Sequence, residues 1–134
     1  MTASACELPS MIATLHSYEN TFGPYAAQTL ALAIQIGRAL WAEGDCHNAR
    51  RLFEHCVRYL PGHGEAALSI RITALTLLRD LLSDMREYES AIAVQRELIE
   101  CRLQSEGPND PGVRSEKAGL AGMLLQNRAS IHAA

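Results

Sequence analysis

The densest group of side chains that could perform chemistry lies between positions 46 and 63. Cys46 and His47 are followed by His55 and Cys56, and then by His63. Thiolate and imidazole groups are the usual ligands of zinc. Neighbouring Cys and His residues on a helix point about 100° apart, and eight residues separate His47 from His55, so four ligands do not converge on one ion. Because Cys46 and Cys56 fall at inward positions of a helical pattern, we expect them to be buried and predict no metal site.

The remaining polar residues form no motif that is typical of catalysis. No histidine accompanies a nucleophile motif such as Gly-x-Ser-x-Gly, and Gly62 and Gly64 lie in a turn between helical patterns rather than after a strand. We therefore expect a protein that is not an enzyme and holds no cofactor. A bound metal found by elemental analysis would support the alternative, a metal- or ligand-dependent enzyme fragment.

A group of charged residues follows helical spacing near the C-terminal half. Acidic residues alternate there with arginines, and the pattern predicts a solvated helix face with ion pairs four residues apart. The residues are Glu87, Glu89, Arg96, Glu97, Glu100 and Arg102.

Length and composition favour a single globular domain. The 134 residues are 48% hydrophobic, 20% charged and only 5% aromatic, so Leu, Ile and Ala must fill the core, which favours helices. A net charge of -3 without a basic stripe argues against nucleic-acid binding. Residues 1–9 do not resemble a signal peptide, and no apolar stretch approaches the roughly 20 residues that span a bilayer. We expect a cytoplasmic protein with no membrane contact, reduced cysteines and disorder over residues 1–7.

The chain aligns with itself at a shift of 42 residues. Gly-Pro turns begin at Gly23 and Gly107, two periods apart, and the intermediate copy starts at Glu65. Apolar positions fall in register between these turns: Ile36 with Leu78 and Leu120, Leu40 with Leu82 and Leu124, and Ala49 with Ala91. The matches lie at the spacing of a helix core, so the repeat has structural meaning.

The first repeat consists of two amphipathic patterns joined by a short polar turn. Apolar residues recur at three- and four-residue steps over residues 28–41 and again over 49–60. In the turn at 42–45, Gly44 suits a left-handed C-terminal cap and Asp45 can cap the next helix.

The second repeat and the chain ends follow the same plan. In the second repeat, the apolar spacing predicts helices over 68–82 and 88–104, with a turn at 83–86. Residues 9–20 are in register with a second helix, and residues 113–130 with a first helix. We therefore predict an all-α fold of about six helices, with two full repeats and two half-repeats, stacked as a right-handed α-solenoid of antiparallel helix pairs.

The first repeat resembles the tetratricopeptide pattern W-x2-L-G-x2-Y, A-x3-F and P. The matching residues are Ile36, Gly37, Ala49, Phe53 and Pro61, with Leu40 at the Tyr and Ala33 at the Trp. In the second repeat, Arg79 replaces the glycine and Gln95 the phenylalanine, so this repeat is degenerate. The 42-residue period and the Gly-Pro-Asn-Asp-Pro turn are similar to the kinesin light chain variety of this family. The resemblance covers about residues 8–130.

The resemblance implies that the first helices of the repeats line a concave groove where partners bind. The candidate groove residues, assigned by register, are Gln35, Arg38, Trp41, Thr73, Thr76, Asp80, Ser83 and Ser115. Only Arg38 is basic, so a clamp for a C-terminal carboxylate is not expected, and Trp41 is either core edge or groove anchor. We expect a protein-protein interaction scaffold whose groove takes an extended peptide or a helix.

The last predicted helix supports a different hypothesis. It has small residues on one side, apolar residues on another, and no following helix to cover it. An uncovered apolar flank favours self-association, so a homodimer formed through terminal helices is the alternative. The candidate self-association residues are Gly119, Gly122, Met123 and Leu125.

Overall fold

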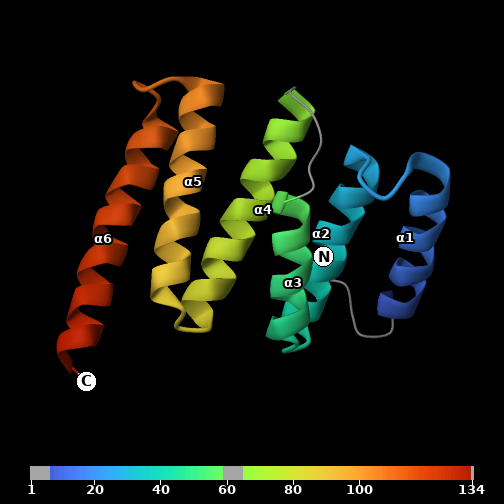
Figure 1. The fold of residues 1–134 in the computed structure, drawn as a ribbon, viewed down its shortest axis with the longest axis horizontal. Coiled ribbons are helices and arrows are strands. Elements are labelled where there is room, and N and C mark those ends of the chain that lie inside the picture. Colours follow the sequence, from blue (N-terminus) through green and yellow to red (C-terminus); the bar gives the residue numbers. More distant parts are fainter. Residues whose placement is uncertain (1–6, 59–64, 134) are drawn as a thin grey trace. The chain divides into compact units, whose positions relative to one another are not determined.

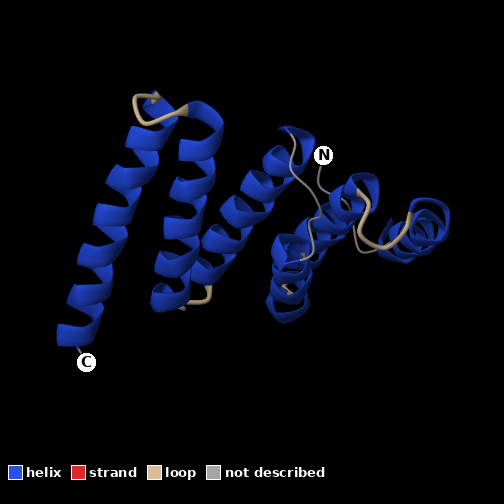
Figure 2. Cartoon of the chain, turned by 45° about the horizontal axis from the view of Figure 1, so that its top comes forward, coloured by secondary structure: helices blue, strands red, loops and turns tan. Residues whose placement is uncertain are grey.

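A computed structural model of the chain describes residues 7–58 and 65–133. The described residues form helices and no strand, joined by short loops (Figures 1 and 2). The six helices are α1 (Leu8–Phe22), α2 (Ala27–Ala42), α3 (Cys46–Arg58), α4 (Glu65–Asp84), α5 (Tyr88–Glu106) and α6 (Pro111–Ala133). The predicted all-helical class with six helices is confirmed for this part of the chain.

The helix ends differ from prediction at the end of α4. Ser83 and Asp84 were expected in a turn but extend α4, and the turn begins at Met85. The predicted stop of the second helix at Pro61 and Gly62 lies outside the described residues.

The chain divides into two compact units, Met1–Ala74 and Leu75–Ala134, with the boundary inside α4. In the first unit, α1 and α3 each pack against α2. Phe53 and Ala49 of α3 are fully buried. A Cβ atom on Gly37 would lie 2.6 Å from Cε1 of Phe53, so the absence of a side chain at Gly37 allows α3 to approach α2 closely.

In the second unit, α5 packs against α6. Leu75 and Leu82 of α4, Ala91 and Leu98 of α5, and Val113 of α6 are buried. Leu124 occupies the same repeat position as Leu82, but Leu124 is 41% exposed whereas Leu82 is 2% exposed. Equivalent positions are buried only where a neighbouring helix covers them.

The backbone at the turns repeats with the sequence period. Gly23 (φ 96°) and Gly107 (φ 85°), two periods apart, end α1 and α5 in the same conformation. Gly44 (φ 87°) and Arg86 (φ 61°), one period apart, both have left-handed backbone. The predicted cap at Gly44 is therefore confirmed, and 42 residues is a period of the chain's conformation as well as of its sequence.

The predicted cap of α3 by Asp45 is confirmed. Asp45 Oδ1 accepts a hydrogen bond of 3.3 Å from the backbone N–H of Asn48, and Oδ2 accepts one of 2.8 Å from the Asn48 side chain. The carboxylate satisfies a donor that the first turn of the helix leaves unpaired.

Candidate functional site

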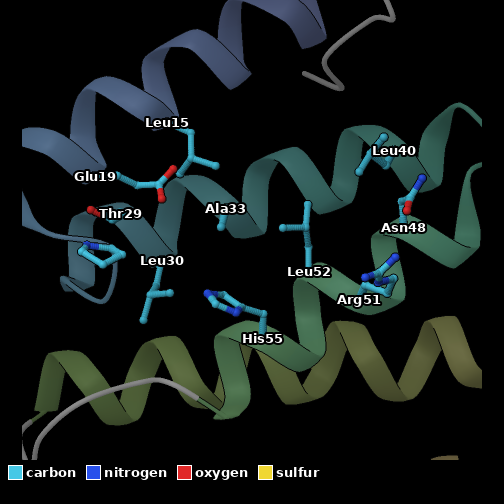
Figure 3. A pocket seen from close by; sticks show the side chains of 11 residues that line it. Leu15, Glu19, Thr29, Leu30, Ala33, Leu40, Asn48, Arg51, Leu52 and His55 are labelled. Atoms are coloured by element: carbon cyan, nitrogen blue, oxygen red, sulfur yellow. The ribbon is translucent and has the colours of Figure 1, made fainter.

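A pocket of about 420 Å³ opens in the unit Met1–Ala74 (Figure 3). It lies on α2, between α1 and α3. The lining residues are Leu15 and Glu19 of α1, Pro24 of the following turn, Thr29, Leu30, Ala33 and Leu40 of α2, and Asn48, Arg51, Leu52 and His55 of α3. Its volume is in the range of a small ligand site or of one or two large side chains.

The floor of this pocket is apolar and its rim is polar. Leu30 and Ala33 are buried beneath it, and Leu52 borders it from α3. Thr29 does not offer a free hydroxyl, since its Oγ1 donates a 2.8 Å hydrogen bond to the Gly23 carbonyl. The free polar groups therefore lie at the rim and not on the floor.

The rim formed by α3 carries positive charge. A second hollow of about 330 Å³ has Arg51 and His55 in common with the pocket and adds Glu54 and Arg58. Glu54 is neutralised by Arg50 at 2.8 Å, whereas neither Arg51 nor Arg58 forms an ion pair with a described side chain. Both of these arginines are exposed. The rim is therefore suited to an acidic group that follows an apolar one.

The predicted groove residues of α2 lie on another side of this helix. Gln35 and Arg38 are exposed. Since successive helical residues are about 100° apart, these two lie roughly opposite Leu30 and Ala33 of the pocket floor. Trp41 is half-buried and lies between the two sides. The predicted surface and the pocket are thus different faces of one helix.

The other predicted groove residues lie in α4 and α6. Thr73 and Ser115 are exposed, and Thr76 and Ser83 are half-buried. Asp80 is exposed but lies 3.0 Å from Nε of Arg79. The groove as a whole stays a prediction.

The two polar replacements in the second repeat form a pair. Arg79 Nη1 donates hydrogen bonds to Oε1 of Gln95 (2.9 Å) and to Oε2 of Glu116 (2.8 Å). Gln95 Nε2 donates to Oε2 (2.8 Å) and to the backbone oxygen (2.6 Å) of Glu116. Gln95 is only 1% exposed, so burial strengthens these bonds. The network joins α4, α5 and α6 where the first repeat has Gly37 against Phe53.

Arg102 also faces inward, contrary to the predicted solvated face. Its Nε is buried at 3.6 Å from Oε1 of Glu116, and its Nη1 lies 3.6 Å from Oε1 of Glu106. The prediction was wrong for Arg102 because helical spacing does not show which helix will cover a face.

A carboxyl pair lies at the turn between α5 and α6. A hydrogen bond with Asp110 raises the pKa of Glu106, and the same bond lowers the pKa of Asp110. Asp110 Oδ2 also accepts a 2.7 Å hydrogen bond from the backbone N–H of Gly112, so it caps α6. The pair therefore has a structural role at this turn.

The cysteines and histidines differ in their surroundings. Cys56 is fully buried, and burial raises the pKa of its thiol to about 12. Cys46 is half-buried, so its predicted inward position is only partly confirmed. His47 is exposed, the His55 ring lies 6.1 Å from that of Tyr25, and His63 lies outside the described residues. In the part of the chain that the structure describes, no three His, Cys, Asp or Glu side chains gather as metal ligands do.

The predicted self-association residues lie on the outer side of α6. Leu125 is 67% exposed and Met123 is half-buried. A Cβ atom on Gly122 would meet nothing within 4 Å, and one on Gly119 would meet only the Gln95 amide nitrogen at 3.4 Å. These glycines therefore permit no close helix contact within the described chain.

No family model and no curated protein matches this chain. The resemblance to tetratricopeptide repeats therefore stays a prediction from the residues of the sequence. No helix within residues 7–58 and 65–133 combines the length and the apolar character that a membrane span requires.

The pocket was not predicted. Its polar residues Asn48, Arg51 and His55 follow helical spacing, which also describes an ordinary solvated face. The signal that could have revealed it is the apolar Leu52 beside Arg51, because the one acidic residue at helical spacing from Arg51, Glu54, also lies four residues after Arg50 and can neutralise only one of the two arginines.

Proposed function

We propose that this chain is a protein-protein interaction module that binds a segment of a partner protein in the α1–α3 pocket. The single observation that carries the proposal is the pocket itself, with an apolar floor and a rim that is cationic along α3. An apolar side chain of the partner fills the floor, and an acidic residue close to it in sequence pairs with Arg51 or Arg58.

The scaffold supports this proposal. We infer that the repeats stack as a right-handed α-solenoid of tetratricopeptide type, and the equivalent backbone at Gly23 and Gly107 is consistent with such a repeat. Scaffolds of this kind serve binding because each repeat contacts only its neighbours and leaves extended surfaces free.

A peptide partner fits the site better than a small ligand does. The rim residues Asn48 and Arg51 are exposed rather than enclosed. Small-ligand sites bury most of the ligand surface, whereas this pocket shares His55 and Arg51 with a second hollow along α3. A segment that follows α3 can occupy both hollows.

The test uses a displayed library of random peptides, selected on the immobilised chain. Three variants then compare the two faces of α2: Ala33→Leu fills the pocket floor, Arg51→Glu reverses the rim charge, and Arg38→Glu is the matched reversal on the predicted groove face. We expect selected peptides to lose binding about tenfold or more to the first two variants and to keep it with the third.

Other results decide against the proposal. Loss of binding with Arg38→Glu together with Trp41→Ala, at unchanged helicity, would show that the predicted groove binds the partner and the pocket does not. A selection that enriches no peptide on the wild-type chain contradicts the proposed function altogether.

A further inference from the structure

The large exposed apolar side chains of the described chain lie on its first and last helices and on the turn after the first. They are Ile12 (42%) and Phe22 (50%) of α1, Tyr25 (45%) of the next turn, and Leu124 (41%) and Leu125 (67%) of α6. Single exposed apolar residues are ordinary on any protein surface. Because these larger ones gather at α1 with its turn and at α6, both helices have surface that a contact could cover.

The repeat period relates these two helices to a pair that does pack. The positions of α1 lie 42 residues before those of α3, and the positions of α6 lie 84 residues after those of α2. Phe53 of α3 lies directly against Gly37 of α2, where a Cβ atom would come within 2.6 Å of the ring. Their counterparts are Met11, half-buried on α1, and Ala121, exposed on α6. The described residues place no helix against Ala121.

The charges of the two helices are opposite. The exposed charged residues of α6 are Arg114, Lys117 and Arg128, all basic, because Glu116 is held in the internal network. In α1 and its cap, Glu7 is acidic and exposed, whereas Glu19 lines the pocket and lies 3.5 Å from Nδ1 of His16. Two α6 helices would bring like charges together, whereas α1 against α6 brings opposite charges together.

We propose that α1 of one copy packs antiparallel on α6 of a second copy, forming a helix pair equivalent to α2–α3. This contact is head-to-tail, so each copy keeps one helix free and further copies can add in series. One helix pair is smaller than a standard interface of about 800 Å² per partner, so we expect association at micromolar rather than nanomolar concentration.

Thr14 and Ala121 are the positions at which to test this contact. Thr14 is one period before Cys56, and Arg114 is two periods after Leu30. In the α2–α3 pair, Sγ of Cys56 lies 3.5 Å from the Leu30 carbonyl oxygen. In the equivalent pair between two copies, a charge at Thr14 therefore comes close to Arg114 of the second copy. Both Thr14 and Ala121 are exposed, so substitutions there leave the core intact.

The experiment measures the mass of the full chain by sedimentation velocity as its concentration increases. We expect the wild-type chain to associate, and Thr14→Arg and Ala121→Arg each to raise the dissociation constant about tenfold or more. Thr14→Glu should retain or strengthen association. Asn20→Arg and Gln126→Arg are matched controls on other sides of the same helices, and circular dichroism checks that helicity is unchanged.

Mixing the two blocked variants decides the geometry. The Thr14→Arg chain keeps a free α6 and the Ala121→Arg chain keeps a free α1, so an equimolar mixture should form a discrete heterodimer of two 14.6 kDa chains. A wild-type chain that stays monomeric at several hundred micromolar overturns the proposal. So does a Thr14→Arg chain that associates like the wild type, or a mixture that stays monomeric.

Discussion

Gly37→Ala perturbs a close contact between α2 and α3 in the first unit. The new Cβ would lie 2.6 Å from Cε1 of Phe53 and 3.1 Å from Cδ1 and Cζ. Carbon atoms pack best at about 3.5–4.0 Å, so α2 and the ring must separate by about 1 Å. Phe53 is 0% exposed, so its ring cannot turn out into solvent without opening the core. Overpacking of this kind costs about 1–3 kcal/mol, while alanine in place of helical glycine contributes about 1 kcal/mol of stability.

Gly122→Ala is the matched control for this substitution. It adds the same methyl group inside a helix, but nothing lies within 4 Å of the new Cβ. We expect Gly122→Ala to raise the free energy of unfolding by about 1 kcal/mol and Gly37→Ala to lower it by about 0–2 kcal/mol. Urea unfolding followed by circular dichroism measures both.

Phe53→Leu tests the cause of the loss. Leucine lacks the ring atoms that the new methyl group meets, so the double variant should be more stable than the sum of the two single changes predicts, by about 1–2 kcal/mol. If Gly37→Ala stabilises the chain as much as Gly122→Ala does, or if the double variant shows no coupling, the close approach of α2 and α3 is refuted.

Three further predictions concern single features. Arg86 has left-handed backbone at the position of Gly44, so Arg86→Gly should raise the free energy of unfolding by about 0.5–1 kcal/mol in urea; a loss would contradict this account. NMR titration should show a raised pKa for Glu106 and a lowered pKa for Asp110, and Asp110→Asn should lower the pKa of Glu106. The Asp110 contribution to stability is lost as the pH falls through its lowered pKa, and that of Glu106 as the pH rises through its raised pKa, so the turn is most stable between the two. Because the thiol of Cys56 is buried with a pKa of about 12, an alkylating reagent should modify Cys46 before Cys56 in the native chain; equal rates for these two by peptide mass mapping would count against this.

Features that depend on local chemistry were predictable from the sequence. The cap at Gly44 requires a residue that tolerates positive φ, and the cap by Asp45 requires a short side chain that carries oxygen, so both residue types identify the turn. The six helices follow from apolar spacing for the same reason. Ser83 and Asp84 were misplaced because neither residue forces a helix to end, and Arg86 gives no sign of its left-handed backbone.

Features that depend on the distance between helices were not predictable. Periodicity shows which face of α2 is buried, but it does not show how far apart α1 and α3 lie on that face. The pocket over Ala33 depends on this separation. Taken one at a time, Arg79 and Gln95 indicate only a degenerate repeat. The signal for the hydrogen-bonded pair is that they replace both members of a contacting pair, with the same spacing of 16 residues in both repeats.

Replacing Arg79 and Gln95 of the second repeat by the glycine and phenylalanine of the family pattern should destabilise the chain. Arg79→Gly with Gln95→Phe removes the three hydrogen bonds that join the side chains of Arg79, Gln95 and Glu116 to one another. The Glu116 side chain is only 15% exposed. Arg102, at 3.6 Å, remains as its one ion-pair partner among the described residues. We expect a loss of about 2–3 kcal/mol in urea unfolding, because a largely buried carboxylate loses its donors. Adding Glu116→Ala should recover most of it, since Ala74 is the residue one period earlier. A double variant as stable as the wild type would show that Arg79, Gln95 and Glu116 are not coupled.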